Sequence, residues 1–269
     1  KTNNKKMEEA NQSEEPKASW DTYIASYEEG KPGITTLRMD LIEHAPIEEF
    51  PHLLVIGFAF DGQPDSGFPK EEERDNIYET DDAIIDFMSS NTNSIHAGSF
   101  TYDSKRLSYF YLNHPNDIES QIEQFSNTQL PEVELFVDLE EDKAWESYLK
   151  FLYPSDDILH YMHDRDVVMQ LEQQGDVLET PRRVDHWVYF KDMDDLGRFS
   201  AEVAKLGFQT EDINETSQEA QPYQLGVWRE NVVELDTIYG VTSELREMAQ
   251  KFNGAYDGWE TEVVRPKEV

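Results

Sequence analysis

Two histidines of the chain, His160 and His163, have the spacing of metal ligands. A helix would place residues three positions apart on one face, and Asp156, Asp157 and Asp164 are close by in the sequence. A metal centre would also need a third and a fourth ligand held in place by hydrogen bonds, and the sequence has no His-Glu-x-x-His motif. We therefore interpret the pair as surface histidines and expect no bound metal, with a metal-dependent enzyme or hydrolase as the weaker alternative.

A third histidine, His186, lies in the middle of the apolar stretch Arg183–Phe190. In an enzyme it would serve as a buried general base. A core histidine that makes one or two hydrogen bonds, with Asp185, Asp257 or the backbone, is the simpler interpretation. Among 57 Asp and Glu residues, chance pairs of carboxylates are uninformative, and the sequence lacks phosphate loops, dinucleotide fingerprints and nucleophile elbows. We expect neither catalytic residues nor a cofactor.

Aromatic residues toward the C-terminus are the third group of interest. Trp and Tyr side chains anchor protein interfaces, although they also pack helices onto sheets. The Asp257-Gly258 pair predicts a β-bulge or turn that re-aims Trp259, because glycine permits a positive φ. The candidate residues of a partner-binding face are Asp185, His186, Trp187, Tyr189, Tyr256, Asp257, Trp259 and Glu260.

The elements that position these residues form a βαββαβ sequence in the C-terminal half. Arg183–Phe190 has the composition of a buried strand, and this element order makes it the central one. We expect the stretch Tyr223–Arg229 to continue into Val232–Thr237 as one long or bulged strand or as a hairpin. The other expected elements are the helix Met193–Leu206, the strand Phe208–Ile213, the helix Thr242–Asn253 and the strand Ala255–Val264.

The N-terminal half shows the same order after an additional hairpin. Its expected elements are the hairpin Trp20–Ser26 and Ile34–Ile42, the strand Leu53–Phe60, the helix Glu71–Ser89, the hairpin Ile95–Tyr102 and Arg106–Leu112, the helix Asn116–Asn127, the strand Glu132–Asp138 and the helix Asp142–Tyr153. The predicted fold class is α+β, with two ferredoxin-like antiparallel-sheet domains, the first carrying the extra hairpin. The predicted boundaries are a flexible leader at 1–19, a first domain at 20–153 and a second at 154–269.

The charge of the chain limits its partners. The 269 residues include 23 Lys and Arg against 57 Asp and Glu, which gives a formal net charge of −34. Such a surface repels phosphate backbones, so we expect no direct nucleic-acid binding. The simplest interpretation of the acidic surface is that it confers solubility, and a protein partner with a basic segment is the alternative. The chain contains no Cys, which excludes disulfides and thiolate sites. The longest apolar run, Leu53–Phe60, is the length of a strand, so no membrane span is predicted.

The C-terminal half resembles the bacterial family named regulator of ribonuclease E activity B. The resemblance begins at the Gly175-Asp176 turn and rests on three segments that agree in order and spacing: Arg183–Phe190, Lys205–Phe208 and Ala255–Thr261. It implies a ferredoxin-like fold that acts by protein–protein contact, because the founding members of the family bind ribonuclease E and restrain RNA decay.

The N-terminal half, from Trp20 to Tyr153, resembles a separate bacterial domain family of unknown function. The resembling segments are the start Trp20–Tyr23, the turn Gly30–Pro32 and the stretch Gly67–Glu72 that leads into the long helix. A fused N-terminal domain departs from the stand-alone regulator, so the fold is a firmer implication of the resemblance than the partner.

The leading hypothesis is a non-catalytic regulator or adaptor in the cytoplasm, which binds a protein and inhibits a ribonuclease E-type endoribonuclease. The alternative is an exported or lipid-anchored envelope protein of ligand-binding or assembly function. The polar segment Lys1–Ser19 motivates that alternative, because a segment of this kind can follow a removed signal sequence.

Overall fold

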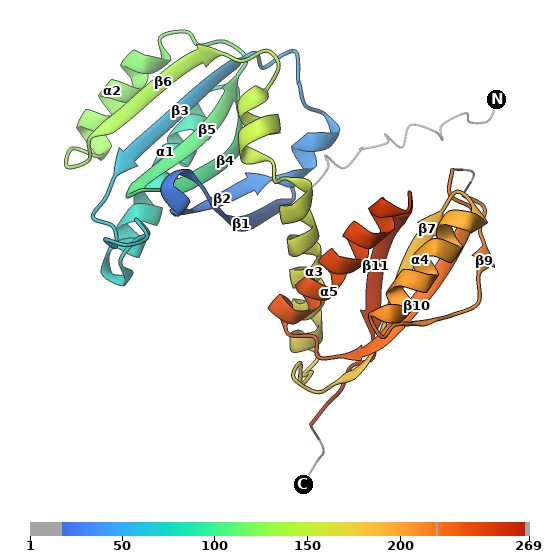
Figure 1. Cartoon of the computed structure of the whole chain (residues 1–269). Coiled ribbons are helices and arrows are strands. Elements are labelled where there is room, and N and C mark those ends of the chain that lie inside the picture. The colour runs from blue at the N-terminus through green and yellow to red at the C-terminus, as the bar shows by residue number, and fades with distance from the viewer. Residues whose placement is uncertain (1–17, 219, 267–269) are drawn as a thin grey trace, which may run out of the picture. The chain divides into compact units, whose positions relative to one another are not determined.

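The computed structural model describes residues 18–218 and 220–266, in which the chain forms two compact units. The N-terminal unit ends at Ser155 and the C-terminal unit begins at Asp156. Of the expected leader at 1–19, only Ala18 and Ser19 lie within the described residues. Each unit combines helices with one antiparallel sheet, so the predicted α+β class is confirmed (Figure 1). No described helix has the length and apolar character needed to cross a membrane.

The sheet of the N-terminal unit has six strands in the order β1-β2-β4-β5-β3-β6. Its pairs are all antiparallel, and β3 lies between β5 and β6. Helix α1 connects β3 to β4 and helix α2 connects β5 to β6, so each connection passes over one intervening strand. The extra hairpin β1-β2 extends the sheet beyond β4. The elements are β1 (Trp20–Ser26), β2 (Pro32–Arg38), β3 (His52–Ala59), α1 (Arg74–Asn91), β4 (Ser94–Tyr102), β5 (Lys105–Leu112), α2 (Ile118–Gln129) and β6 (Leu135–Glu141).

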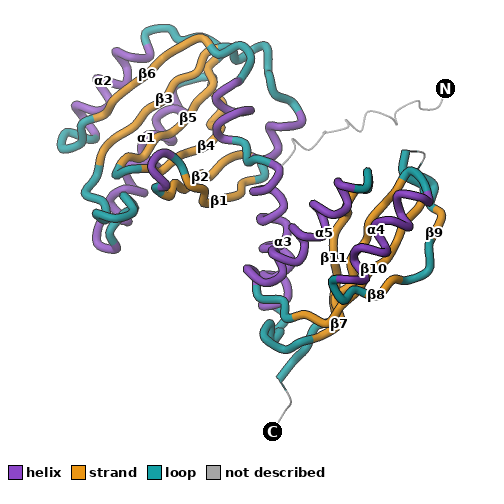
Figure 2. Tube along the Cα trace, viewed as in Figure 1, coloured by secondary structure: helices purple, strands orange, loops and turns teal. Residues whose placement is uncertain are grey.

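Both faces of this sheet are covered. Helices α1 and α2 pack on one face, where residues such as Ile84, Ile122 and Phe110 form a buried apolar cluster (Figure 2). On the other face Trp145 stacks on Tyr111, with the ring centroids 3.8 Å apart, and Leu152 is fully buried. Aromatic pairs of this kind contribute about 0.5–1.5 kcal/mol beyond their buried area.

The segment after β6 differs from the α-helix expected over Asp142–Tyr153, because residues Ser147–Leu152 form a π-helix. Asp142 accepts hydrogen bonds from the backbone N–H groups of Glu146 and Ser147, and the hydroxyl of Tyr111 accepts one from the N–H of Tyr148. These side chains accept hydrogen bonds from backbone N–H groups at the start of the segment, groups that a regular α-helix would leave unsatisfied or bond internally. The wider turn of the π-helix leaves room for these side-chain contacts.

The C-terminal unit has the sheet order β11-β7-β10-β8, with β9 also paired to β10. Strand β7 lies between β10 and β11, which confirms its predicted central position. The elements are α3 (Asp156–Gln173), β7 (Arg182–Phe190), α4 (Met193–Lys205), β8 (Gln209–Thr210), β9 (Asn214–Glu215), β10 (Tyr223–Asn231), α5 (Leu235–Lys251) and β11 (Ala255–Thr261).

Two predicted elements of this unit were wrong in extent. The expected strand Phe208–Ile213 shrinks to the two residues of β8, since Phe208 itself turns into the core. The expected strand Val232–Thr237 does not form, because α5 begins at Leu235. The β-branched Val232 and Val233 have the composition of a strand, but the buried positions that follow them repeat with helical spacing.

The core of the C-terminal unit lies between β7 and its helices. Val184, Val188 and Phe190 of β7 are fully buried in one cluster with residues of α3, α4 and α5, including Phe199 and Leu245. Figure 1 shows α4 and α5 lying across the same side of β7, β10 and β11. Burying each such side chain contributes about 1.5–3 kcal/mol, so this face holds the unit together.

Candidate functional site

Alternation along β7 separates the candidate residues onto two faces of the C-terminal sheet. Val184, His186 and Val188 are buried beneath the helices, whereas Asp185, Trp187 and Tyr189 are half-buried on the opposite side. We call this opposite side the open face, because no described helix of this unit contributes to it. Its residues on the three long strands and the adjoining Glu211 are Arg183, Asp185, Trp187, Tyr189, Glu211, Gln224, Gly226, Trp228, Glu230, Ala255, Gly258 and Glu260.

On the helix side, His186 is fully buried and contacts Tyr256. Its Nδ1 atom is 2.9 Å from the Tyr256 hydroxyl, and its Nε2 atom has no partner among the described residues. The partner is therefore Tyr256, where the sequence suggested Asp185, Asp257 or the backbone. Burial, together with the charge of Arg229, lowers the pKa of His186 from 6.5 to about 3. A neutral, enclosed imidazole of this kind packs the core and cannot exchange protons with a substrate in solution.

Trp259 also belongs to the helix side. Its indole nitrogen donates to Asp164 at 2.8 Å, and the hydroxyl of Thr242 donates to the second oxygen of that carboxylate at 2.6 Å. Arg246 lies 3.9 Å from the same oxygen and balances its charge. These contacts to Asp164 connect α3, α5 and β11, and the indole of Trp259 is only 9% exposed. Sequence reasoning missed Asp164 as an internal residue, although its spacing to Val168 predicts the same inward helix face.

The predicted bulge in β11 is confirmed, and it explains why Tyr256 and Trp259, three positions apart, lie on the same side of the sheet. The register of β11 against β7 shifts between Tyr256 and Gly258, with Asp257 as the extra exposed residue. The bulge places Tyr256 opposite Val188 and Trp259 opposite His186. Both aromatic side chains therefore point beneath the helices, and Glu260 remains on the open face.

The open face gains an aromatic residue that the sequence analysis did not single out. Trp228 of β10 lies opposite Asp185, on the same side as Trp187 and Tyr189. Alternation along the predicted strand Tyr223–Arg229 was the signal that could have identified it. The three aromatic residues are half-buried, and the hydroxyl of Tyr189 accepts a hydrogen bond of 2.6 Å from Gln224.

Arg183 is the one cation among the open-face residues, and acidic neighbours hold it. Its Nε atom is 2.9 and 3.0 Å from the two carboxylate oxygens of Asp185, and one terminal nitrogen also contacts Glu211. Its guanidinium carbon lies 4.5 Å from the centre of the Trp228 ring. The pairs with Asp185 and Glu211 raise the pKa of Arg183 above its ordinary value. The arrangement is a guanidinium resting on an indole and flanked by carboxylates.

Trp187 lies between two glycines. Gly226 of β10 and Gly258 of β11 are its direct cross-strand neighbours, so neither side of the indole meets an opposing side chain from a paired residue. A Cβ atom at Gly258 would have no heavy atom within 4 Å, and one at Gly226 would meet only the side chain of Glu211 at 3.2–3.3 Å. The sheet surface beside Trp187 therefore carries no side chain over Gly258, a space that we call the recess, whereas Glu211 covers the Gly226 side.

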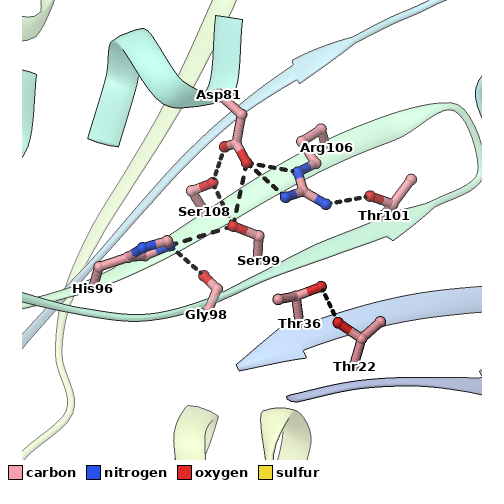
Figure 3. A network of polar contacts seen from close by, with 9 residues as sticks. All are labelled: Thr22, Thr36, Asp81, His96, Gly98, Ser99, Thr101, Arg106 and Ser108. Atoms are coloured by element: carbon pink, nitrogen blue, oxygen red, sulfur yellow. Dashed lines mark hydrogen bonds and ion pairs between the residues drawn. The ribbon is translucent and has the colours of Figure 1, made fainter. Parts of the chain in front are cut away.

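A buried polar network in the N-terminal unit has residue types that occur in catalytic triads (Figure 3). Arg106 donates to one Asp81 oxygen at 2.6 and 2.9 Å, Ser108 donates to the other, and Ser99 contacts both Ser108 and His96. The carboxylate thus holds an arginine and serines, whereas a triad carboxylate orients the histidine.

Burial of the network supports a structural role. Ser99 is 2% exposed and Asp81 is 3% exposed, so no substrate reaches the hydroxyl. Burial also lowers the pKa of His96 from 6.5 to about 4, which removes it as a base that could be charged near neutral pH. The network fastens α1 to β4 and β5.

Depressions also lie elsewhere among the described residues, including one in each unit. The first, of about 340 Å³ in the N-terminal unit, lies between the start of α1 and the ends of β3 and β6, and its lining includes Phe58, Ile77 and Glu73. The second lies in the C-terminal unit and contains His160 beside Asp156 and Arg246. Within the described residues, no group of three His, Asp or Glu side chains is placed to hold a metal ion.

Comparison with known proteins defines the class of each unit. Residues 18–153, just over half of the chain, match the family described as Family of unknown function (DUF695), and the chain belongs to that family. Residues 162–261 match the family described as Regulator of ribonuclease activity B. Both resemblances stated from the sequence are thereby confirmed.

A particular relative supports the second match. A protein of Xenorhabdus nematophila named Regulator of ribonuclease activity B is 27% identical over 99 residues, which cover 36% of this chain and 70% of that protein. Among solved structures, an unknown protein from Galdieria sulphuraria is similar over 77% of this chain and 95% of its own, with 13% identity. Its TM-score of 0.21 is too low to support an argument about the fold.

Proposed function

We propose that this protein is a non-catalytic regulator that binds and inhibits a ribonuclease E-type endoribonuclease. The observation that carries the proposal is the match of residues 162–261 to the ribonuclease-regulator family, supported by the Xenorhabdus nematophila relative of that name. The match spans β7, α4, β10, α5 and β11, and therefore the complete open face. A ribonuclease of this type is a cytoplasmic protein, and the proposal includes that compartment.

The geometry of the C-terminal unit supports binding in preference to catalysis. The buried His186 is neutral and enclosed, whereas the open face presents the half-buried aromatic side chains of Trp187, Tyr189 and Trp228. Half-buried aromatic residues on a rigid strand lose little conformational freedom on binding, which suits them as interface anchors. We therefore propose the open face as the partner-binding surface.

This proposal revises the set of site residues. Asp185, Trp187, Tyr189 and Glu260 remain candidates for partner contact, and Asp257 borders them at the bulge. Trp228, Arg183 and Glu230 join the set because they occupy the same face. His186, Tyr256 and Trp259 are proposed to support the face from beneath without touching the partner.

The test measures RNA cleavage by the purified ribonuclease E-type enzyme of the same organism in the presence of the intact chain. The proposal predicts that the initial cleavage rate falls in a saturable manner as the chain is added, and that the inhibition weakens for Trp187→Ala. Met193→Ala, which alters an exposed side chain on α4, serves as the control and should inhibit like the unchanged protein. An unchanged cleavage rate at the highest protein concentrations would contradict the proposal.

A further inference from the structure

We infer that the open face binds an arginine-bearing basic segment of its protein partner, with an arginine guanidinium seated against the indole of Trp187. The inference rests on the proposed function, because it names the chemistry by which the regulated partner is held. It is carried by three properties of the open face: its uncompensated charge, the geometry around Trp187 and an arginine–indole contact already present beside it.

The charge of the open face favours a cationic ligand. Arg183 is already paired with Asp185 and Glu211, so it neutralises none of the remaining carboxylates. Glu230 and Glu260 are exposed, and neither makes an ion pair with a described residue. These two carboxylates lie on the strands that flank β7, one on each side of it. A cation over Trp187 would have Glu260 as a diagonal neighbour on the β11 side and the side chain of Glu211 on the β10 side, whereas Glu230 lies opposite Arg183, further along β7.

The geometry around Trp187 leaves room for a ligand side chain. Of its two cross-strand neighbours, Gly226 is covered by the side chain of Glu211, but Gly258 contributes no Cβ atom and the space above it is empty to 4 Å. A planar group can therefore lie beside the indole on the Gly258 side without displacing part of the protein. An aromatic ring in a recess of this kind attracts a cation through its electron-rich face.

A contact within the protein shows the interaction that the partner would reproduce. The guanidinium of Arg183 lies 4.5 Å from the centre of the Trp228 ring while carboxylates hold its nitrogen atoms. Trp187 offers a second indole on the same face, with Glu260 as an acidic neighbour, and without an arginine of its own. Arginine suits this position better than lysine, since its planar guanidinium can stack on the ring and still donate to carboxylates.

The same charges disfavour the other possible occupants of the face. Nucleic acid would bring phosphates against Glu230 and Glu260, and the chain as a whole has a net charge of −34. A second copy of this chain would oppose one acidic face with another. A basic protein segment is the occupant that lowers the electrostatic energy.

The test follows the indole N–H signals of the intact chain by NMR while a short arginine-rich peptide is added. The chain has five Trp residues, so the spectrum is simple. The inference predicts that the signals of Trp187 and Trp228 shift, whereas those of the buried Trp145 and Trp259 stay in place. A lysine-rich peptide of the same length should bind more weakly, and an acidic peptide should cause no shift.

Two variants test the recess directly. Trp187→Ala should weaken peptide binding about fivefold, the ratio that corresponds to a cation–π contact of about 1 kcal/mol. Gly258→Val should weaken it similarly by filling the recess, and the fold should tolerate this change since nothing lies within 4 Å of the new Cβ. Gly197→Val is the matched control, because Gly197 is also open to solvent but lies on α4, across the sheet from the open face.

The inference is overturned if the peptide binds Trp187→Ala and Gly258→Val as tightly as the unchanged protein. It is also overturned if single-stranded RNA, or self-association of the chain, produces the same shifts. Titration with the intact ribonuclease separates the two proposals. If the enzyme binds equally to wild type and Trp187→Ala, the open-face site and the inference fail together, and the ribonuclease assignment stands. If the peptide binds as predicted and the enzyme does not bind at all, the ribonuclease assignment fails and the basic-segment site stands.

Discussion

At the scale of single residues, burial decides which of the chemically capable side chains can act. On the C-terminal strands, His186 has the chemistry of a base and Trp259 that of an interface anchor, and both side chains are buried. Their hydrogen bonds to Tyr256 and Asp164 serve the core. Trp187, half-buried and flanked by glycines, is left as the residue most suited to contact a partner.

The buried state of His186 predicts a pH dependence of stability. Its pKa falls from 6.5 to about 3 on folding, so between these values the unfolded chain binds a proton that the folded chain does not. The free energy of unfolding should therefore decrease as the pH falls below 6.5. From pH 7 to pH 5, this one group should account for a loss of about 2 kcal/mol.

Urea unfolding of the unchanged protein and of His186→Gln at both pH values checks this prediction. The variant should lose less stability than the unchanged protein between pH 7 and pH 5, because glutamine does not titrate. His96 and the carboxylates contribute equally to both proteins and cancel in the comparison. An identical loss in the two proteins would contradict the burial of a neutral His186.

Replacing Trp187 or Trp259 by alanine should lower the stability of the protein by different amounts. Trp259→Ala should lower the free energy of unfolding by about 3–5 kcal/mol, because it opens a cavity and removes a donor from the buried Asp164. Trp187→Ala should cost well under half as much, since its indole lies on the open face. Thermal unfolding of both variants measures the difference, and equal costs would show that Trp187 is also a core residue.

At the scale of elements, the βαββαβ order was enough to predict the central position of β7, and the Asp257-Gly258 pair was enough to predict the bulge in β11; strand alternation then grouped the residues of each strand by side. It could not show which face the helices cover, because alternation groups residues by side without identifying the side. Tyr256 and Trp259 were therefore grouped with Trp187, although the bulge brings these two residues onto the same side and that side faces the helices. The early start of α5 was missed because Val232 and Val233 look like the continuation of a strand. The π-helix near Tyr148 depends on a side-chain contact with Tyr111, which is distant in sequence.

The attachment of α1 to its sheet predicts a large effect of breaking one buried ion pair. Asp81→Asn should lower stability by about 3–5 kcal/mol, since it leaves the enclosed guanidinium of Arg106 without a countercharge. Chemical denaturation measures the cost. The double variant Asp81→Leu with Arg106→Met should recover part of the loss by removing the unpaired charge. If Asp81→Asn is as stable as the unchanged protein, the network does not hold α1 in place.

At the scale of the whole molecule, the net charge of −34 shapes association more than it shapes the fold. An acidic surface steers basic segments toward the chain, and salt screens that attraction over about 10 Å at 0.1 M ionic strength. We propose that the open face adds local specificity to this general field by combining carboxylates with half-buried aromatic rings. The N-terminal unit belongs to a family of unknown function, and its buried polar network is built to support α1.

The charge distribution predicts which acidic residues govern the association rate. Replacing Glu230 and Glu260 by glutamine should slow binding to the ribonuclease and flatten its salt dependence, because both are exposed carboxylates of the open face. Replacing Glu244 and Glu247 on α5 removes the same charge from exposed positions on the helix side. Stopped-flow measurements should show a smaller effect for this control pair. Equal effects of the two pairs would indicate general charge attraction without a defined face.

The most direct measurement is the equilibrium binding of the purified intact chain to the purified ribonuclease E-type enzyme of its own organism by calorimetry. The account predicts a saturable complex that weakens at least about tenfold for Trp187→Ala, as expected for an interface anchor, and is unaffected by Met193→Ala. Absence of heat at moderate salt, with both proteins folded, would contradict the proposed regulator. Binding that is indifferent to Trp187→Ala would place the partner on another surface.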